Sequence, residues 1–401
     1  MSEWKEYKLG ELIKDIAAGP FGSNLKVECF VESGFPIIDG ANLKGIRVTD
    51  NITKYVTEEK ARSLHRAIAK RNDVVVTISG NVGQISYIPD DSKYLEYLVS
   101  QRQFRATFDV TKVDVPFLVY YFHTRVGQHK ILSFANQVGV PALAQPIKNF
   151  REIELALPPL DEQKRIAEVL SSLDDKIDLL HRENATLEAL AETLFRHYFI
   201  ETPNPSWKEG KLGDILSVKG GTTPSTNEPK YWNGNIAWTS PRDVTTLNGM
   251  YLFKTERTIT EEGLAKISSG LLPAGTLLMS SRAPVGVLAF AEIPVAINQG
   301  YIAIMDDKGY PKEFIYLWLK ENMEAVHSYS NGSTFMEISK TAFKSIDITI
   351  PDKQTVIEFN KQIKPLFEKI KTNQQQILTL SIQRDLILPH LMSCDETTLW
   401  Q

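Results

Sequence analysis

The chain of 401 residues has only two cysteines, Cys29 and Cys394. They form neither the ligand spacing of a metal site nor a disulfide framework, so we expect a reducing, cytoplasmic compartment. The sequence also lacks any run of about 18 apolar residues, which a membrane-spanning helix requires. The polar first ten residues lack the apolar segment of a signal peptide.

Recognisable catalytic motifs are equally scarce. The sequence has no phosphate-binding G-x-x-x-x-G-K-[ST] loop and no G-x-G-x-x-G after a strand, and its seven histidines are scattered. We therefore expect no catalytic residue, no metal ion and no cofactor in this chain, which disfavours an enzyme that acts alone. The formal charge of −4, from 45 basic and 49 acidic side chains, neither requires nor excludes a local basic groove.

Two long stretches place apolar residues at alternating spacings of three and four, which is typical of coiled-coil helices. In the first stretch the seam positions are Ile166, Leu170, Leu173, Ile177, Leu180, Asn184, Leu187 and Leu194. In the second stretch they are Ile363, Leu366, Ile370, Asn373, Ile377, Leu380, Ile387 and Leu391. The alternative is that each helix packs only on its own neighbouring domain, but such long periodic runs favour a helix as the partner.

Each seam contains one asparagine near its middle. If the two helices pair antiparallel, Asn184 faces Asn373, and apolar positions face each other on both sides of this pair. A buried polar pair in a coiled coil fixes register and orientation at some cost in stability. The sequence therefore predicts an antiparallel coiled coil.

The two halves of the chain resemble each other. The stretch "WKEYKLGELI" at 4–13 returns as "WKEGKLGDIL" at 207–216, and "VVVTISGNVGQ" at 74–84 resembles the stretch at 277–287 at the same offset. Short β-rich runs alternate with helical ones, so each half predicts a mixed α/β unit followed by a long helix, with internal two-fold pseudo-symmetry. The expected division is a first globular domain, a central helix, a second globular domain and a C-terminal helix with a tail, at residues 1–160, 161–200, 201–352 and 353–401.

Polar loops that contain glycine, amide and basic side chains occur at corresponding places in both halves. Glycine permits a close backbone approach, and asparagine, glutamine and arginine can bind base edges. An ordinary turn is the alternative for any single loop, but recurrence in both halves favours DNA binding. The candidates are Lys26, Asn42, Lys44, Arg47, Ser79, Asn81, Gln84, Arg102, Arg105, Lys219, Thr222, Thr223, Arg242, Ser280, Ser281 and Arg282.

Three stretches carry a resemblance to a known family. The run "LPPLDEQKRIAEVLSSLDDKI" at 157–177, "AETLFRHYF" at 191–199 and "LILPHLMS" at 386–393 resemble the specificity subunit of type I restriction–modification enzymes. The second copy of the first motif, "IPDKQTVI", keeps only Gln354 and the apolar positions, so its match is weaker.

This resemblance implies two target-recognition domains and two long helices in a non-catalytic subunit. Each domain would read one half of a bipartite site in double-stranded DNA, and the helices would set the spacer between the halves. The implied partners are two methyltransferase subunits, which would bind S-adenosylmethionine, and restriction/translocase subunits held through the complex. The alternative is a coiled-coil scaffold with two related protein-binding domains, which salt-dependent, site-specific DNA binding would exclude.

Overall fold

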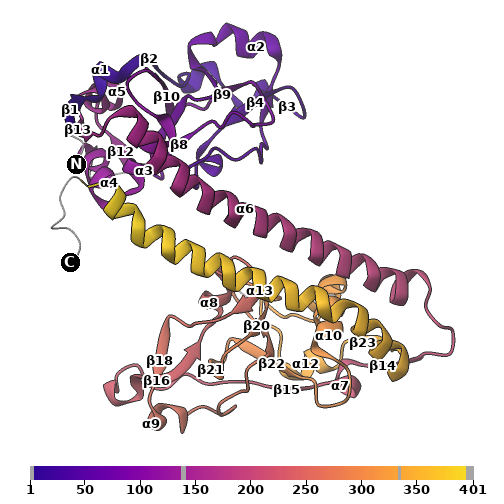
Figure 1. Ribbon diagram of the computed structural model, residues 1–401. Coiled ribbons are helices and arrows are strands. Elements are labelled where there is room, and N and C mark those ends of the chain that lie inside the picture. The colour runs from indigo at the N-terminus through magenta and orange to yellow at the C-terminus, as the bar shows by residue number, and fades with distance from the viewer. Residues whose placement is uncertain (1–3, 137–140, 333–335, 394–401) are drawn as a thin grey trace. The chain divides into compact units, whose positions relative to one another are not determined.

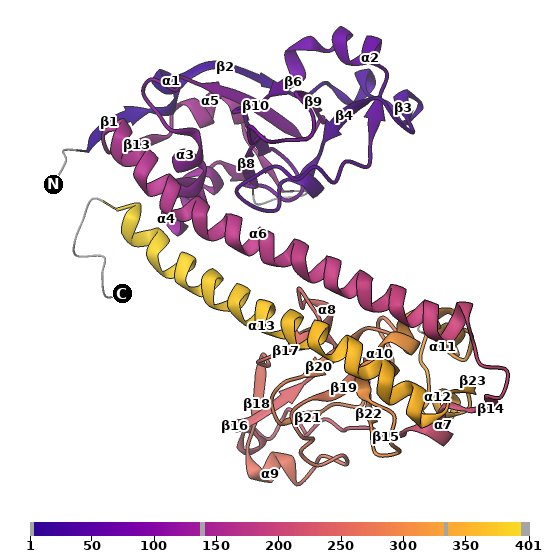
Figure 2. The ribbon, with the colours of Figure 1, turned by 45° about the vertical axis from the view of Figure 1, so that its right-hand side comes forward.

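Two long helices dominate the computed structural model (Figures 1 and 2). They are α6 (Leu160–Arg196) and α13 (Lys353–Leu391), and they coincide with the two stretches that have the coiled-coil pattern. A short π-helical turn, His197–Glu201, ends the first helix just before the Thr-Pro-Asn-Pro segment. Pro365 removes one backbone donor from α13, but the helix continues through it.

The structure describes residues 4–136, 141–332 and 336–393, so Cys394 lies outside the described residues. The chain divides into two units, and each long helix contributes to both. Unit 1 consists of Met1–Lys176 and Leu380–Gln401, and unit 2 consists of Ile177–Thr379. The domain boundaries expected from the sequence stay a prediction.

Unit 1 is built on two small sheets and an N-terminal strand pair. The pair joins β1 (Lys5–Lys8) to β13 (Glu154–Leu157), the strand just before α6. One sheet is antiparallel, with the order β2 (Ile13–Ala18), β10 (Gln103–Phe108), β7 (Val74–Thr77), β8 (Ile85–Tyr87). The other has the order β3 (Phe30–Val31), β5 (Tyr55–Val56), β4 (Phe35–Ile38), β9 (Glu96–Val99), β6 (Ile68–Lys70). A further pair joins β11 (Ala135–Asn136) to β12 (Ala142–Leu143).

Five short helices complete unit 1: α1 (Leu9–Leu12), α2 (Glu58–Ser63), α3 (Val115–His123), α4 (Arg125–Leu132) and α5 (Pro146–Arg151). The side chains of Asp114 and Thr124 cap α3 and α4 by accepting a hydrogen bond from a backbone N–H in the first turn. The helix α3 is almost entirely apolar because it lies in the core of the unit. That core includes Ile166 and Leu170 from α6 and Met392 just beyond α13, so both long helices pack on this unit.

Unit 2 repeats this plan. Its first strand, β14 (Lys208–Lys211), pairs with β23 (Asp347–Ile350), the strand just before α13. One sheet has the order β15 (Ser217–Lys219), β22 (Tyr301–Met305), β19 (Thr276–Ser280), β20 (Leu288–Ala291), β17 (Tyr251–Leu252). The other has the order β18 (Arg257–Ile259), β16 (Trp232–Thr239), β21 (Val295–Ile297). The short helices are α7 (Leu212–Ile215), α8 (Pro241–Thr245), α9 (Glu261–Leu264), α10 (Lys312–Glu321), α11 (Met323–Ser328) and α12 (Lys340–Lys344).

The strand orders confirm the internal repeat. Strands β2, β10, β7 and β8 of unit 1 correspond in order and sequence position to β15, β22, β19 and β20 of unit 2. The second sheet of each unit contains one parallel pair, β4 with β9 and β16 with β21. The mixed α/β class and the internal repeat predicted from the sequence are therefore both present.

Within unit 2 the two long helices run antiparallel in the expected register. The Nδ2 atom of Asn373 donates to Oδ1 of Asn184 at 2.9 Å, and Nε2 of Gln362 donates to the hydroxyl of Tyr198 at 2.7 Å. None of the sixteen predicted seam side chains is exposed. The same helices also pack on the globular cores, as Phe195 of α6 and Phe359 of α13 do in unit 2. The helix faces therefore make two kinds of contact, one with the partner helix and one with a globular core, and the alternative interpretation described the second.

The asparagine pair gives a first testable expectation. Changing Asn184 to leucine removes one partner of the buried Asn373 amide, which should cost about 1–3 kcal/mol of unfolding free energy. The Nδ2 atom of Asn373 also donates to Oε2 of Glu183 at 2.9 Å, and its Oδ1 atom has no hydrogen-bond partner within the described residues. A denaturant titration of the two single variants and of the double leucine variant measures the coupling. The double variant should recover most of the loss, whereas additive losses would show that the two amides act independently.

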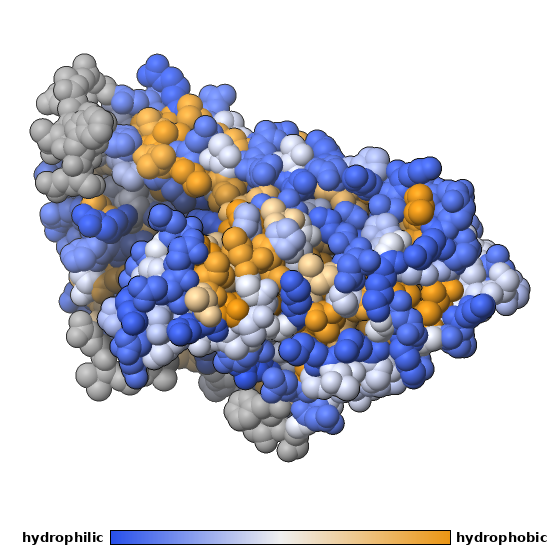
Figure 3. All heavy atoms as spheres, turned by 90° about the horizontal axis from the view of Figure 1, so that it is seen from below, coloured by the Kyte–Doolittle hydropathy of each residue, from blue (hydrophilic) through white to orange (hydrophobic). Residues whose placement is uncertain are grey.

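No helix in the described parts of the chain is long and apolar enough to cross a membrane. On the face shown in Figure 3, hydrophobic residues lie in separate patches among hydrophilic ones.

Candidate nucleic-acid interface

A polar cleft of about 560 Å³ opens in unit 1. It lies where the loops that follow β4 and β7 meet the loop that precedes β10, at residues 39–41, 79–81 and 100–103. The side chains of Thr77 and Gln84 complete its polar lining. Two of these three loops contain residues that the sequence analysis selected, so the fold does bring part of the candidate set together.

Four side chains in this cleft form a connected hydrogen-bond network. The hydroxyl of Thr77 donates to Oε1 of Gln84 at 3.1 Å, and Nε2 of Gln84 donates to the carbonyl of Gly40 at 3.2 Å. The Nε2 atom of Gln103 lies 3.4 Å from the Thr77 hydroxyl, and the hydroxyl of Ser100 donates to Oε1 of Gln103 at 2.5 Å. This network fixes the orientation of both amides. Gln84 is partly exposed and its NH₂ group keeps a second hydrogen for a ligand, whereas Gln103 is buried beneath it.

The rim of the cleft carries charge. Arg102 and Asn81 are exposed, and Arg102 forms no ion pair with any part of the chain that the structure describes. Lys54 pairs with Asp39 at 2.7 Å. Burial opposes ionisation of Asp39, but hydrogen bonds from Lys54 and the backbone N–H of Ala41 outweigh it and lower the pKa of this carboxyl. The rim therefore combines a neutralised ion pair with one free arginine, which suits a polyanion better than a neutral ligand.

Unit 2 reproduces the first of these loops. In unit 1 the side chain of Asp39 accepts from the Ala41 N–H at 2.9 Å, and the side chain of Asn42 accepts from the Asp39 N–H at 3.0 Å. In unit 2 the side chain of Asp243 accepts from the Ser240 N–H at 2.8 Å in the same capping arrangement. The correspondence predicted between these two loops is therefore confirmed by their local geometry.

A second loop is also repeated. Gly83 and Gly286 have φ values of +88° and +94°, which side chains with a Cβ rarely adopt. In unit 1 the Nε2 atom of His123 lies 2.8 Å from the carbonyl two residues after this glycine. In unit 2 Nε2 of His327 lies 3.3 Å from the carbonyl just before it. Burial lowers the pKa of His123, which favours the neutral ring in this contact.

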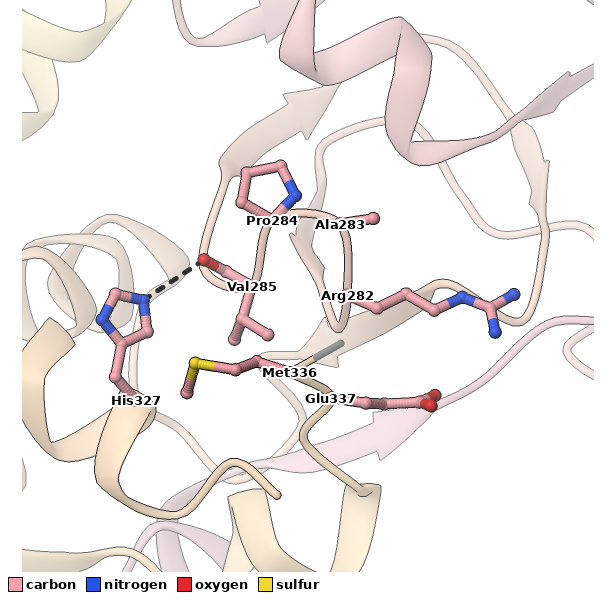
Figure 4. Close-up of a pocket in the computed structure, with 7 residues that line it drawn as sticks. All are labelled: Arg282, Ala283, Pro284, Val285, His327, Met336 and Glu337. Carbon is pink, nitrogen blue, oxygen red and sulfur yellow. Dashed lines mark hydrogen bonds between the residues drawn. The ribbon is translucent and has the colours of Figure 1, made fainter. Parts of the chain in front are cut away.

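The pocket beside this loop in unit 2 has a different character (Figure 4). It measures about 560 Å³ and is lined by Arg282, Ala283, Pro284, Val285, His327, Met336 and Glu337. In Figure 4 the side chains of Val285 and Met336 lie toward the imidazole of His327, while the side chains of Arg282 and Glu337 extend together on the other side. This pocket thus differs in its chemistry from the amide-rich cleft of unit 1.

The structure sorts the sixteen DNA-binding candidates by exposure. The exposed ones are Lys26, Lys44, Asn81, Arg102, Lys219, Thr223 and Arg242. The partly exposed ones are Arg47, Ser79, Gln84, Thr222 and Arg282. The buried ones are Asn42, Arg105, Ser280 and Ser281.

The four buried candidates lie inside the units. The guanidinium of Arg105 donates to Asp15 at 2.6 Å and to the carbonyl of Arg66 at 3.1 Å, and only 8% of the residue is exposed. The side-chain amide of Asn42 donates to the carbonyls of Thr49 and Asn51. These groups hold loops together in the structure, and DNA contact by them stays a prediction.

The two serines of unit 2 are buried as well. The hydroxyl of Ser280 donates to the carbonyl of Pro284 at 2.6 Å and accepts from the N–H of Val287 at 2.9 Å. Ser281 is 3% exposed beside it. Ser280 therefore holds the loop from within, whereas the hydroxyl of Ser281 has no hydrogen-bond partner among the described residues.

The sequence analysis did not select several residues that line the cleft: Asp39, Lys54, Thr77, Ser100, Gln101 and Gln103. Gln101 and Gln103 flank Arg102, so the same polar stretch contained the signal. Lys54 has no such signal, because only the fold brings it to Asp39. Among the described residues, no cluster of metal-ligating side chains occurs.

Comparison with known proteins identifies the family that this duplicated α/β fold represents. Residues 1–189 and 204–381 match the model of the type I restriction modification DNA specificity domain, so the chain belongs to that family. The MjaIX specificity subunit of Methanocaldococcus jannaschii is 34% identical over 192 residues, which cover 47% of this chain but only 44% of that relative. The HindI specificity subunit of Haemophilus influenzae is 21% identical over 98% of this chain and 99% of its own length.

A solved structure has the same fold. The S subunit of a type I restriction–modification system from M. genitalium superposes with a TM-score of 0.61, covering 98% of this chain and 97% of that one, at 17% identity.

Proposed function

We propose that this chain is the DNA-binding specificity subunit of a type I restriction–modification complex. Each unit would read one half of a bipartite target in double-stranded DNA. One observation carries this proposal: polar loops recur on corresponding strands of the two units, in a chain that belongs to the DNA specificity family. The chemistry of these loops differs between the units, which suits two unrelated half-sites.

The long helices would set the spacer between the half-sites and dock the other subunits of the complex. Both helices carry large apolar side chains that stay exposed, such as Val169 on α6 and Leu386 on α13, at 49% and 63%. A partner that covers these side chains would remove their apolar surface from water, which favours association. We propose two methyltransferase subunits as these partners, with S-adenosylmethionine bound there, and restriction/translocase subunits held through the complex. The chain itself would act in the cytoplasm without catalysis.

The proposal is tested by DNA binding of the chain assembled with its methyltransferase subunits. Selection from a randomised duplex library should return a two-part sequence, and its affinity should exceed that of random DNA by about 10³-fold or more at physiological salt. Recovery of no preferred sequence would refute the DNA-recognition function and would favour the protein-binding scaffold.

Arg102 supplies a residue-level expectation. Changing Arg102 to alanine should weaken binding to the selected target by roughly 1–3 kcal/mol, because the cleft of unit 1 loses one exposed guanidinium group. Competition binding measures this loss. The matched control is Arg151→Ala, which removes the same charge from an exposed position on α5 that does not line the cleft. Equal losses for the two variants would mean that the cleft is not where unit 1 binds DNA.

A further inference from the structure

An arginine in unit 2 lies flat on a pair of tryptophans. The Cζ atom of Arg257 is 3.5 Å from the ring centroid of Trp232 and 5.6 Å from that of Trp238. The first distance is the contact distance of two stacked planar groups, so the guanidinium covers the face of the indole. Arg257 is also the strand partner of Trp238, since β18 and β16 are paired in that register.

The tryptophans form a fixed platform for this arginine. Their rings meet edge to face at 5.0 Å, and the two residues are 7% and 4% exposed. The indole N–H of Trp232 donates to the carbonyl of Ser225 at 3.0 Å, and that of Trp238 lies 3.4 Å from the carbonyl of Thr222. The platform is therefore tied to the polar loop at residues 220–227, which contains the DNA-binding candidates Thr222 and Thr223.

The hydrogen-bonding fork of Arg257 stays unused. The residue is exposed, and its guanidinium forms no ion pair or hydrogen bond within the part of the chain that the structure describes. Its neighbour Glu256 faces another cation, Arg242, at 3.6 Å. Lys266 lies 5.9 Å from the ring of Tyr231 and adds a second positive charge near the platform. A guanidinium that is held in one orientation with all its donors free can form two parallel hydrogen bonds to an oxyanion such as a phosphate.

Unit 1 supplies an internal contrast. Arg62 lies over Phe35 at 5.4 Å, but its guanidinium is neutralised by Glu58 at 2.8 Å and Glu96 at 2.6 Å. A stacked arginine that has only a structural function thus acquires carboxylate partners in this fold. Arg257 has none among the described residues.

We infer that Arg257 binds a phosphate of the DNA backbone beside the half-site of unit 2. This inference rests on the proposed DNA-binding function. Phosphate contacts fix the position of a protein on the duplex, whereas base contacts read the sequence. Because the tryptophans that orient Arg257 also hold the loop at 220–227, a phosphate bound here would place that loop in register with the bases.

The first test measures how binding to the selected target depends on salt. Each phosphate neutralised contributes about 0.9 to the slope of log K against log salt concentration. We expect Arg257→Ala to reduce the slope by about that amount and to weaken binding about ten-fold near 0.1 M salt, with equal loss for specific and random DNA. Arg62→Ala is the matched control and should leave the slope unchanged. An unchanged slope in Arg257→Ala would overturn the inference, as would relaxed preference at a single base pair, which would indicate base reading.

A second test needs no substitution in the protein, so it does not depend on folding of the variant. Duplexes that carry one neutral methylphosphonate at successive positions around the unit 2 half-site should reveal one position where the unmodified complex loses about ten-fold in affinity. The Arg257→Ala variant should lose no further affinity on the same modified duplex, because the substitution and the neutral phosphonate remove the same contact. Additive losses at every position would refute the contact. If the unmodified complex selects no target at all, the proposed function fails instead, and the two failures are distinguishable.

Discussion

Exchanging unit 2 for that of a relative with a different target is expected to change one half of the recognised sequence and leave the other half intact. Affinity for the original target should fall by about 10³-fold or more, to the level of random DNA, because one half-site then presents mismatched bases. The physical reason is that the polar loops of each unit are held by hydrogen bonds from within that unit. Library selection with the assembled complex is the measurement.

The packing of the helices decides where the exchange should be made. Phe199 and Phe359 lie in one core with Phe314 of the globular part, and the hydroxyl of Tyr316 donates to Glu188 of α6 at 2.7 Å. An exchange of residues 201–351 cuts through these contacts, whereas an exchange of Ile177–Thr379 keeps them. Both chimeras should change the same half-site, and the larger exchange should be the more stable one. A chimera with both halves altered would contradict independent reading.

The helices and the repeat could be predicted because their signals are local or recur at a fixed offset. Seam positions such as Leu180 and Ile377 repeat every three or four residues, and helical periodicity alone places them on one face. The pairing of Asn184 with Asn373 followed from aligning two such faces, and it is present at 2.9 Å.

The candidate sites could be predicted only in part, because the sequence does not show which polar side chains the interior uses. In β10 the polar residues Gln103 and Arg105 alternate with Phe104, as in a strand with one face in solvent. Both faces of β10 are covered instead, and the guanidinium of Arg105 donates a hydrogen bond to Asp15 inside the unit. Arg257 is the opposite case, since its platform exists only once the register of β16 and β18 is known.

A buried glutamine on α13 shows how tightly unit 2 is joined to its helix. The Oε1 atom of Gln374 accepts from the backbone N–H groups of Met250 at 3.2 Å and Tyr251 at 3.0 Å, and its Nε2 atom donates to the carbonyl of Tyr251 at 2.7 Å. Only 6% of this residue is exposed. The hydroxyl of Tyr251 returns a hydrogen bond to the carbonyl of Phe367 on the same helix at 3.0 Å. One side chain thus satisfies three backbone groups that water does not reach.

Changing Gln374 to leucine is therefore expected to destabilise unit 2 by at least about 3 kcal/mol, because three buried groups are left unpaired and each costs about 1–3 kcal/mol. A loss of that size should lower the melting temperature of unit 2 by roughly 10 °C. Calorimetry of the full chain is the measurement, since two units can melt separately and only the transition of unit 2 should move. The neighbouring Gln375 is exposed on the same helix, so Gln375→Leu makes the same chemical change outside the core and should shift unfolding by less than about 0.5 kcal/mol. Equal effects of the two changes, or an equal shift of both transitions, would show that Gln374 does not hold the globular part of unit 2 to α13.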